Sequence, residues 1–158
     1  MTIDISDPST AELFRMRNSL EVLVGLEALE NCTLHDLVPL KQSLTRLDER
    51  IGAVDPAGFL AECNAFQRYV ASLVSNDLLK AIYSTLIDEL DKRVIPITAD
   101  ERPMTREAMA NRKEYFQRVY LALRDRNAAE LYRIGYESAI GWNPWQEFLE
   151  SMHLIAES

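Results

Sequence analysis

Three polar residues lie on helical faces that are otherwise apolar, and they are the first candidates for a binding site. Arg17 follows Leu13 by four residues, and Gln67 and Ser138 each follow an apolar residue by the same interval. Residues four apart are neighbours on a helix, so each polar side chain shares its face with apolar ones. A buried polar group requires a partner in the protein or in a ligand. Both alternatives stay open: Arg17 could pair with Glu21 and Gln67 with the backbone, or the three could bind a ligand.

Residue types that carry catalysis are few. Cys63 lies among apolar residues at helical spacing, which favours a packed thiol over a nucleophile, because a reactive cysteine needs a base beside it. His35 stands near the start of one expected helix and His153 near the end of another, and a histidine near a helix C-terminus more often interacts with the helix dipole than catalyses a reaction. The chain has no dinucleotide-binding glycine motif, P-loop, nucleophile elbow or HExxH zinc motif. Acid–base chemistry by a tyrosine, a glutamate or Cys63 stays open.

The composition indicates an ordinary globular protein. The 158 residues are 47% hydrophobic and carry 17 Lys and Arg against 25 Asp and Glu, a net charge of −8. We expect a single domain over residues 1–158 and no direct nucleic-acid contact, because phosphate repels an acidic chain. The locally basic stretch 102–126 is interpreted as a solvated helix face. Without a signal peptide, a membrane-spanning stretch or a CxxC pair, the chain is expected in the cytoplasm and away from membranes.

Helix start signals recur along the whole chain. A capping residue repeatedly precedes apolar residues spaced three and four apart. The expected helices cover approximately residues 10–26, 36–52, 56–73, 78–94, 105–124, 127–140 and 143–156. The fourth should end at Ile95-Pro96, before a loop over 98–104. The buried face of the first is expected from the apolar row Leu13, Met16, Leu20, Leu23, Val24 and Leu26. Strand signals are nearly absent, so the prediction is an all-α antiparallel helical bundle of about six or seven helices.

Four short motifs, in order and at compatible spacing, resemble a known family. Residues 12–21 read ELFRMRNSLE, residues 59–67 FLAECNAFQ, residues 75–79 SNDLL and residues 122–129 ALRDRNAA. They resemble the ligand-binding C-terminal domain of FadR-type members of the GntR transcription factors, over about residues 11–139. The resemblance implies a helical bundle around a central cavity that holds a small effector.

The resemblance also implies where a metal would lie in that cavity. The family often binds a divalent metal through an Asp and three His, and the matching positions here read Cys63, Gln67, Phe116 and Ser138. Phenylalanine cannot coordinate, and the amide and the hydroxyl are poor ligands for such metals. We therefore expect no metal and no cofactor. Arg17 matches an arginine that commonly faces the effector, and a guanidinium binds a carboxylate strongly. These five positions are the candidate ligand-binding residues, and the expected ligand is an organic acid with an apolar body.

Three functions remain possible at this point. The first is a metal-independent small-molecule sensing and dimerisation module of the kind found in transcriptional regulators, acting as a homodimer. The alternatives are a free-standing enzyme that reuses the cavity and a protein-interaction module whose cavity is filled. About ten residues precede the first helix, so the winged helix-turn-helix of the family is not expected here. The extra helix at about 143–156, next to Trp142 and Trp145, is expected to be a lid, a self-association patch or part of the core.

Overall fold

The computed structural model describes residues 4–100 and 104–140, and every regular element within them is a helix. The six helices are α1 (Thr10–Asn31), α2 (Leu37–Gly52), α3 (Pro56–Ser72), α4 (Asp77–Asp100), α5 (Arg106–Arg124) and α6 (Ala128–Ile140). The predicted all-α helical bundle is confirmed. The expected seventh helix, with Trp142 and Trp145, lies outside the described residues.

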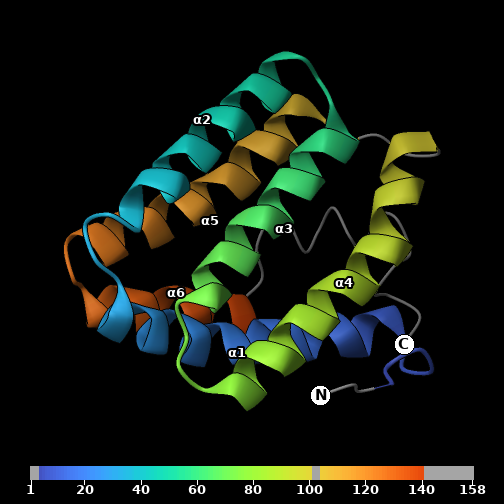
Figure 1. Cartoon of the computed structure of the whole chain (residues 1–158). Coiled ribbons are helices and arrows are strands. Elements are labelled where there is room, and N and C mark those ends of the chain that lie inside the picture. The colour runs from blue at the N-terminus through green and yellow to red at the C-terminus, as the bar shows by residue number, and fades with distance from the viewer. Residues whose placement is uncertain (1–3, 101–103, 141–158) are drawn as a thin grey trace.

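The helices form two groups that cross each other (Figure 1). Helices α2 and α3 run antiparallel, α5 lies beside α2, and α4 lies beside α3 in the opposite direction. Helices α1 and α6 pack along each other across one end of this group, and α1 also contacts α3 and α4. The inner faces of five helices, α1 and α3 to α6, therefore converge on one region of the core.

Side-chain caps begin most of the helices where the sequence predicts. At the start of α1, Oγ of Ser9 accepts a hydrogen bond from the Glu12 amide at 3.2 Å, and the Glu12 carboxylate accepts one from the Ser9 amide at 2.7 Å. Four further caps accept a hydrogen bond from the amide three residues on, before α3 to α6: Asp55, Asn76, Thr105 and Asn127. These local signals explain why the helix starts could be predicted.

Helix α4 extends beyond its expected end. The predicted stop at Ile95-Pro96 is wrong, because the helix continues through Pro96 to Asp100. A proline inside a helix removes one hydrogen bond of the preceding turn. Leu90 and Val94 nevertheless bury their side chains against the core up to that point, and this packing holds the helix in place. Residues 98–100, which were expected in a loop over 98–104, are therefore helical.

The buried face of α1 also differs from the expected apolar row. Met16 and Leu23 are 51% and 53% exposed, whereas the charged residues Arg17 and Glu21 are buried. Helix α1 carries apolar side chains on most of its circumference, so their spacing alone does not identify the inward face. The inward face is the one that meets α3, α4 and α6.

Close contact between α1 and α6 depends on a glycine. A Cβ atom added to Gly135 would lie 2.5 Å from Cγ2 of Val22 and 2.9 Å from its Cα. Only a residue without a side chain fits this distance between the two helices. None of the helices among the described residues is long and apolar enough to span a membrane.

Candidate functional site

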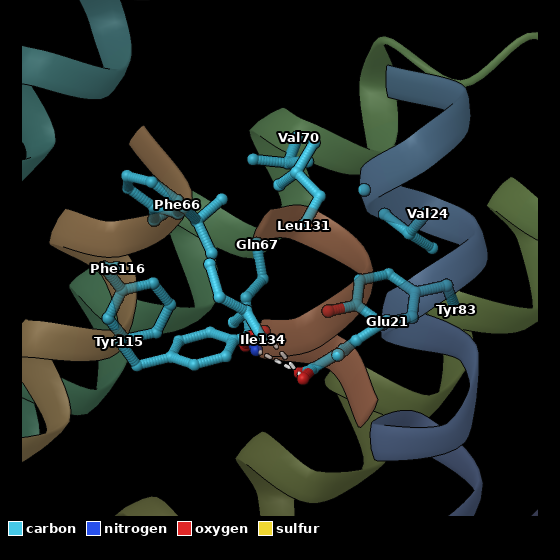
Figure 2. Close-up of a pocket in the computed structure, with 13 residues that line it drawn as sticks. Glu21, Val24, Phe66, Gln67, Val70, Tyr83, Tyr115, Phe116, Leu131 and Ile134 are labelled. Carbon is cyan, nitrogen blue, oxygen red and sulfur yellow. Dashed lines mark hydrogen bonds between the residues drawn. The ribbon is translucent and has the colours of Figure 1, made fainter. Parts of the chain in front are cut away.

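A pocket lies where α1, α3, α4, α5 and α6 converge (Figure 2). Its lining residues are Glu21, Val24, Gly25, Phe66, Gln67, Val70, Tyr83, Tyr115, Phe116, Val119, Leu131, Ile134 and Gly135. The cavity between them has a volume of about 30 Å³, within about 410 Å³ of space that is partly open to solvent. That is room for a water or two, so a larger ligand must displace side chains as it enters.

Glu21 is the centre of the polar end of this pocket. Its carboxylate accepts hydrogen bonds from Nε2 of Gln67 at 2.9 Å, from the hydroxyl of Tyr115 at 2.6 Å and from Oγ of Ser138 at 2.9 Å. The donors come from three different helices, α3, α5 and α6. Figure 2 shows Gln67 and Glu21 meeting at the lower end of the pocket. A buried carboxylate needs such donors in place of water.

Arg17 is buried next to this carboxylate. Its Nε lies 3.6 Å from Oε1 of Glu21, and its guanidinium donates to Oδ1 of Asn18 at 3.2 and 2.9 Å. It lines a smaller neighbouring pocket between α1, α3 and α4. The pairing of Arg17 with Glu21 is one of the alternatives that the sequence left open. Gln67, by contrast, binds the side chain of Glu21 and not the backbone.

A second arginine, Arg112, is buried near Arg17 and Glu21. Its guanidinium lies over the rings of Tyr115 and Phe116, at 4.5 and 4.8 Å from their centroids. Burial, followed by the positive charge of Arg17, lowers the pKa of Arg112 below its ordinary value. The interpretation of stretch 102–126 as a solvated face is wrong at this residue, which is 6% exposed.

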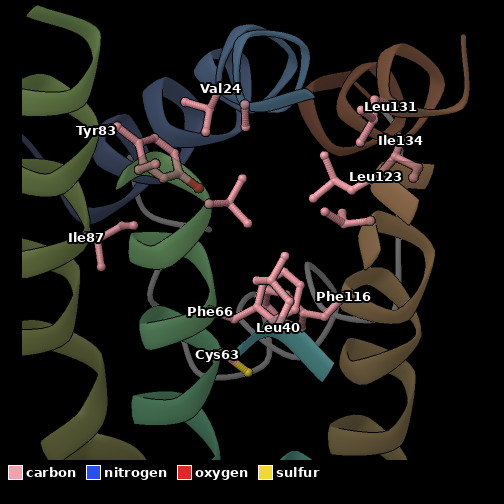
Figure 3. Packing of buried hydrophobic residues seen from close by; sticks show 14 of the residues in the cluster. Val24, Leu40, Cys63, Phe66, Tyr83, Ile87, Phe116, Leu123, Leu131 and Ile134 are labelled. Atoms are coloured by element: carbon pink, nitrogen blue, oxygen red, sulfur yellow. The ribbon is translucent and has the colours of Figure 1, made fainter. Parts of the chain in front are cut away.

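Aromatic rings form the wall opposite α1. Phe116 is fully buried and contacts Phe66 and Tyr115 edge-on, with ring centroids 5.0 and 5.1 Å away. Figure 3 shows Phe66 and Phe116 next to Leu40, with Cys63 below them. The rings bury a large apolar surface in a geometry that aromatic pairs prefer. The wall suits an apolar ligand body.

Cys63 lies in this apolar layer rather than at the polar end. Burial raises the pKa of its thiol to about 12, even though Arg112 and Arg17 favour the thiolate. At neutral pH the group is therefore a protonated thiol. This environment fits the packed cysteine that the sequence favours and argues against a nucleophile.

Because Cys63 is buried and Cys32 also has a raised pKa, we expect neither thiol to react readily in the folded protein. Ellman's reagent at pH 8 should react slowly with native protein and release two thiols per chain in denaturant, matching the two cysteines. Rapid reaction of one thiol in the native state would contradict this account and support the enzyme alternative.

The structure brings most of the predicted site residues together, but through a residue that was not among them. Gln67, Ser138 and Arg17 all contact Glu21, while Phe116 forms the adjoining wall and Cys63 is separate. The residues missed by the sequence were Glu21, Tyr83, Arg112 and Tyr115. The signal for Glu21 was its position four residues after Arg17, on the same helical face.

The two tyrosines are fixed as hydrogen-bond donors. Burial, followed by the negative charge of Glu21, raises the pKa of Tyr83 and of Tyr115 well above its ordinary value. Both hydroxyls therefore keep their protons at neutral pH. Both tyrosines line the pocket.

The donor set does not fit the divalent metal that the family often binds. Gln67 and Ser138 direct their donors to Glu21, Phe116 offers no ligand atom, and the thiol of Cys63 is protonated. Among residues 4–100 and 104–140, no group of three or more His, Cys, Asp or Glu side chains is arranged to hold a metal ion. At the polar end of the pocket, the side chains of Gln67 and Ser138 donate hydrogen bonds to Glu21 instead.

Comparison with known proteins agrees with the geometry. A search of curated proteins finds no match. The family model of the FCD domain matches residues 12–137, which include Arg17, Glu21, Gln67 and Tyr115 and most of the bundle, and Ser138 is the next residue. The chain therefore belongs to the FCD family, the ligand-binding regulatory domains of GntR-type regulators.

Proposed function

We propose that this FCD domain is a metal-independent sensor for a small organic acid with an apolar body, and that it acts as a homodimer. The observation that carries the proposal is a guanidinium buried at the polar end of the site. Arg17 is buried, its Nε lies 3.6 Å from the Glu21 carboxylate, and its hydrogen bonds go to the neutral amide of Asn18. A buried guanidinium that donates its hydrogen bonds to a neutral group favours an anionic ligand.

The acid group of the ligand is proposed to bind Arg17. A carboxylate accepts two parallel hydrogen bonds from a guanidinium, and it would replace the contact with Asn18 and compete with the longer one to Glu21. The apolar body would enter the main pocket between Phe66, Phe116 and the side chains of α6. Because little of this pocket is open to water, ligand entry would shift side chains and bias the arrangement of α1 against α6.

Exposed apolar side chains support the proposed dimer. Met16 and Leu23 on α1 and Tyr132 and Tyr136 on α6 are each about half exposed, and the two helices are neighbours. Large apolar side chains exposed on neighbouring helices are the kind of surface through which proteins associate. Basic residues of α5 such as Lys113 and Arg118 are paired with carboxylates, which supports the proposal that this chain does not itself contact DNA. Two free cysteines and no membrane-spanning helix among the described residues fit a cytoplasmic location.

Replacing Arg17 tests where the acid binds. Calorimetric titration with hexanoate in the presence of EDTA should show binding to the unmodified protein. The affinity of Arg17→Ala should be lower by a factor of about ten or more, because the charge-assisted hydrogen bonds to the acid are lost. Arg15→Ala is the matched control, since Arg15 is an exposed arginine of the same helix. Equal affinities of the two variants would refute the assignment of Arg17, provided that circular dichroism shows both folded.

A further inference from the structure

We infer that the ligand of this pocket carries a hydroxyl group that donates a hydrogen bond to Oε1 of Gln67. The inference rests on the proposed function and narrows the ligand from an organic acid to a hydroxylated one. It starts from a single atom in the pocket lining, the amide oxygen of Gln67, which is buried and accepts no hydrogen bond.

Gln67 is 4% exposed and lines the pocket at its polar end. Its Nε2 donates to Oε1 of Glu21 at 2.9 Å, and this bond sets the orientation of the amide. Exchanging the amide oxygen and nitrogen would place two acceptors against each other, because an ionised carboxylate has no proton to donate. The oxygen of Gln67 is therefore the atom left without a partner.

Two neighbouring hydroxyl groups already donate their protons to Glu21. Tyr115 and Ser138 both give their protons to Glu21. A hydroxyl has only one proton, so neither can also donate to Gln67 while it serves the carboxylate. An unsatisfied buried acceptor costs free energy, and a ligand that supplies the donor recovers it.

A neutral hydroxyl fits this position better than an ammonium group. Arg17 and Arg112 already place two positive charges in this part of the core, and burial lowers the pKa of Arg112. A third cation would be repelled and would have to lose its hydration. An uncharged O–H group satisfies the acceptor without that penalty.

Calorimetry with matched acids tests the inference. The probes are butanoate and hexanoate, each compared with all of its monohydroxy isomers and with the corresponding amino acids, in the presence of EDTA. At least one hydroxy isomer should bind with an affinity at least about ten times that of its parent acid. It should also bind more tightly than the amino acid that carries its amino group on the same carbon. Scanning the hydroxyl along the chain removes any assumption about its distance from the acid group.

Two variants identify the acceptor. Gln67→Leu, or Gln67→Met if the first is not folded, should abolish the preference for the hydroxy isomer. Gln42→Leu is the matched control, because Gln42 is an exposed glutamine of α2 outside the pocket, and it should keep the preference.

The possible failures are distinguishable. Binding of the parent acids without any gain from a hydroxyl would overturn this inference and leave the proposed function standing. A preference that survives in the Gln67 variants would also overturn it. No binding of any acid, parent or hydroxylated, would overturn both.

Discussion

Replacing Glu21 by alanine is expected to lower the free energy of unfolding by about 3–5 kcal/mol, the usual cost of removing one member of a buried charged pair. The carboxylate receives hydrogen bonds from Gln67, Tyr115 and Ser138 and faces the guanidinium of Arg17. Its removal leaves these donors and a positive charge buried without their shared acceptor. The loss should appear as a lower midpoint in urea denaturation followed by circular dichroism.

Glu30→Ala is the matched control for this experiment. Glu30 is an exposed glutamate of the same helix, and its replacement should change the free energy of unfolding by less than about 0.5 kcal/mol. Glu21→Gln should give an intermediate loss, because the amide keeps an acceptor oxygen but not the charge. If Glu21→Ala were as stable as Glu30→Ala, the carboxylate would not organise the polar end of the pocket.

Gly135→Ala is expected to lower the free energy of unfolding by about 2–3 kcal/mol, in spite of the better helix propensity of alanine. The added Cβ would lie 2.9 Å from Cα and 3.0 Å from the backbone nitrogen of Val22. A clash with backbone cannot be relieved by a change of rotamer, so α1 and α6 must move apart. Thermal unfolding monitored by circular dichroism measures the loss.

Gly52→Ala controls for the glycine replacement itself. A Cβ at Gly52 would have no atom within 4 Å, so this variant should be unchanged or slightly more stable. Val22→Ala in the Gly135→Ala background should restore only part of the stability, because it removes Cγ2 but not the backbone atoms. Full stability of Gly135→Ala would mean that the two helices are not held as closely as described.

The helix starts could be predicted because their causes are local. Ser9 with Glu12, and Asn127 with the residues after it, are contacts within a few residues of the chain. The end of α4 and the buried face of α1 could not be predicted from the sequence, because contacts with other helices determine both. Leu90 and Val94 hold α4 against the core near Pro96, and α6 together with α3 and α4 selects which side of α1 is buried.

The sequence identified several residues of the candidate site but not the hydrogen bonds that connect them. Gln67 and Ser138 stand out as polar residues on apolar faces, yet both bind Glu21, from which they are separated by 46 and 117 residues in the chain. Only the fold shows this shared partner. Arg112 was hidden within a run of charged residues, most of which do face solvent or pair near the surface. Its inward position follows from the apolar neighbours Met109 and Phe116 on the same side of α5.

The central claim is that the pocket binds a small organic acid without a metal, and native mass spectrometry tests it most directly. Protein purified without added metal should be measured as isolated, without a chelator. It should be measured again after incubation with hexanoate and its hydroxy isomers, with and without EDTA, and under denaturing conditions. We predict a dimer that carries one acid per chain, with a mass excess that disappears on denaturation and contains no metal. A stoichiometric metal ion, or acid binding that EDTA abolishes and zinc restores, would contradict metal independence. A bare protein under every condition would contradict the sensor and favour an interaction module with a filled cavity.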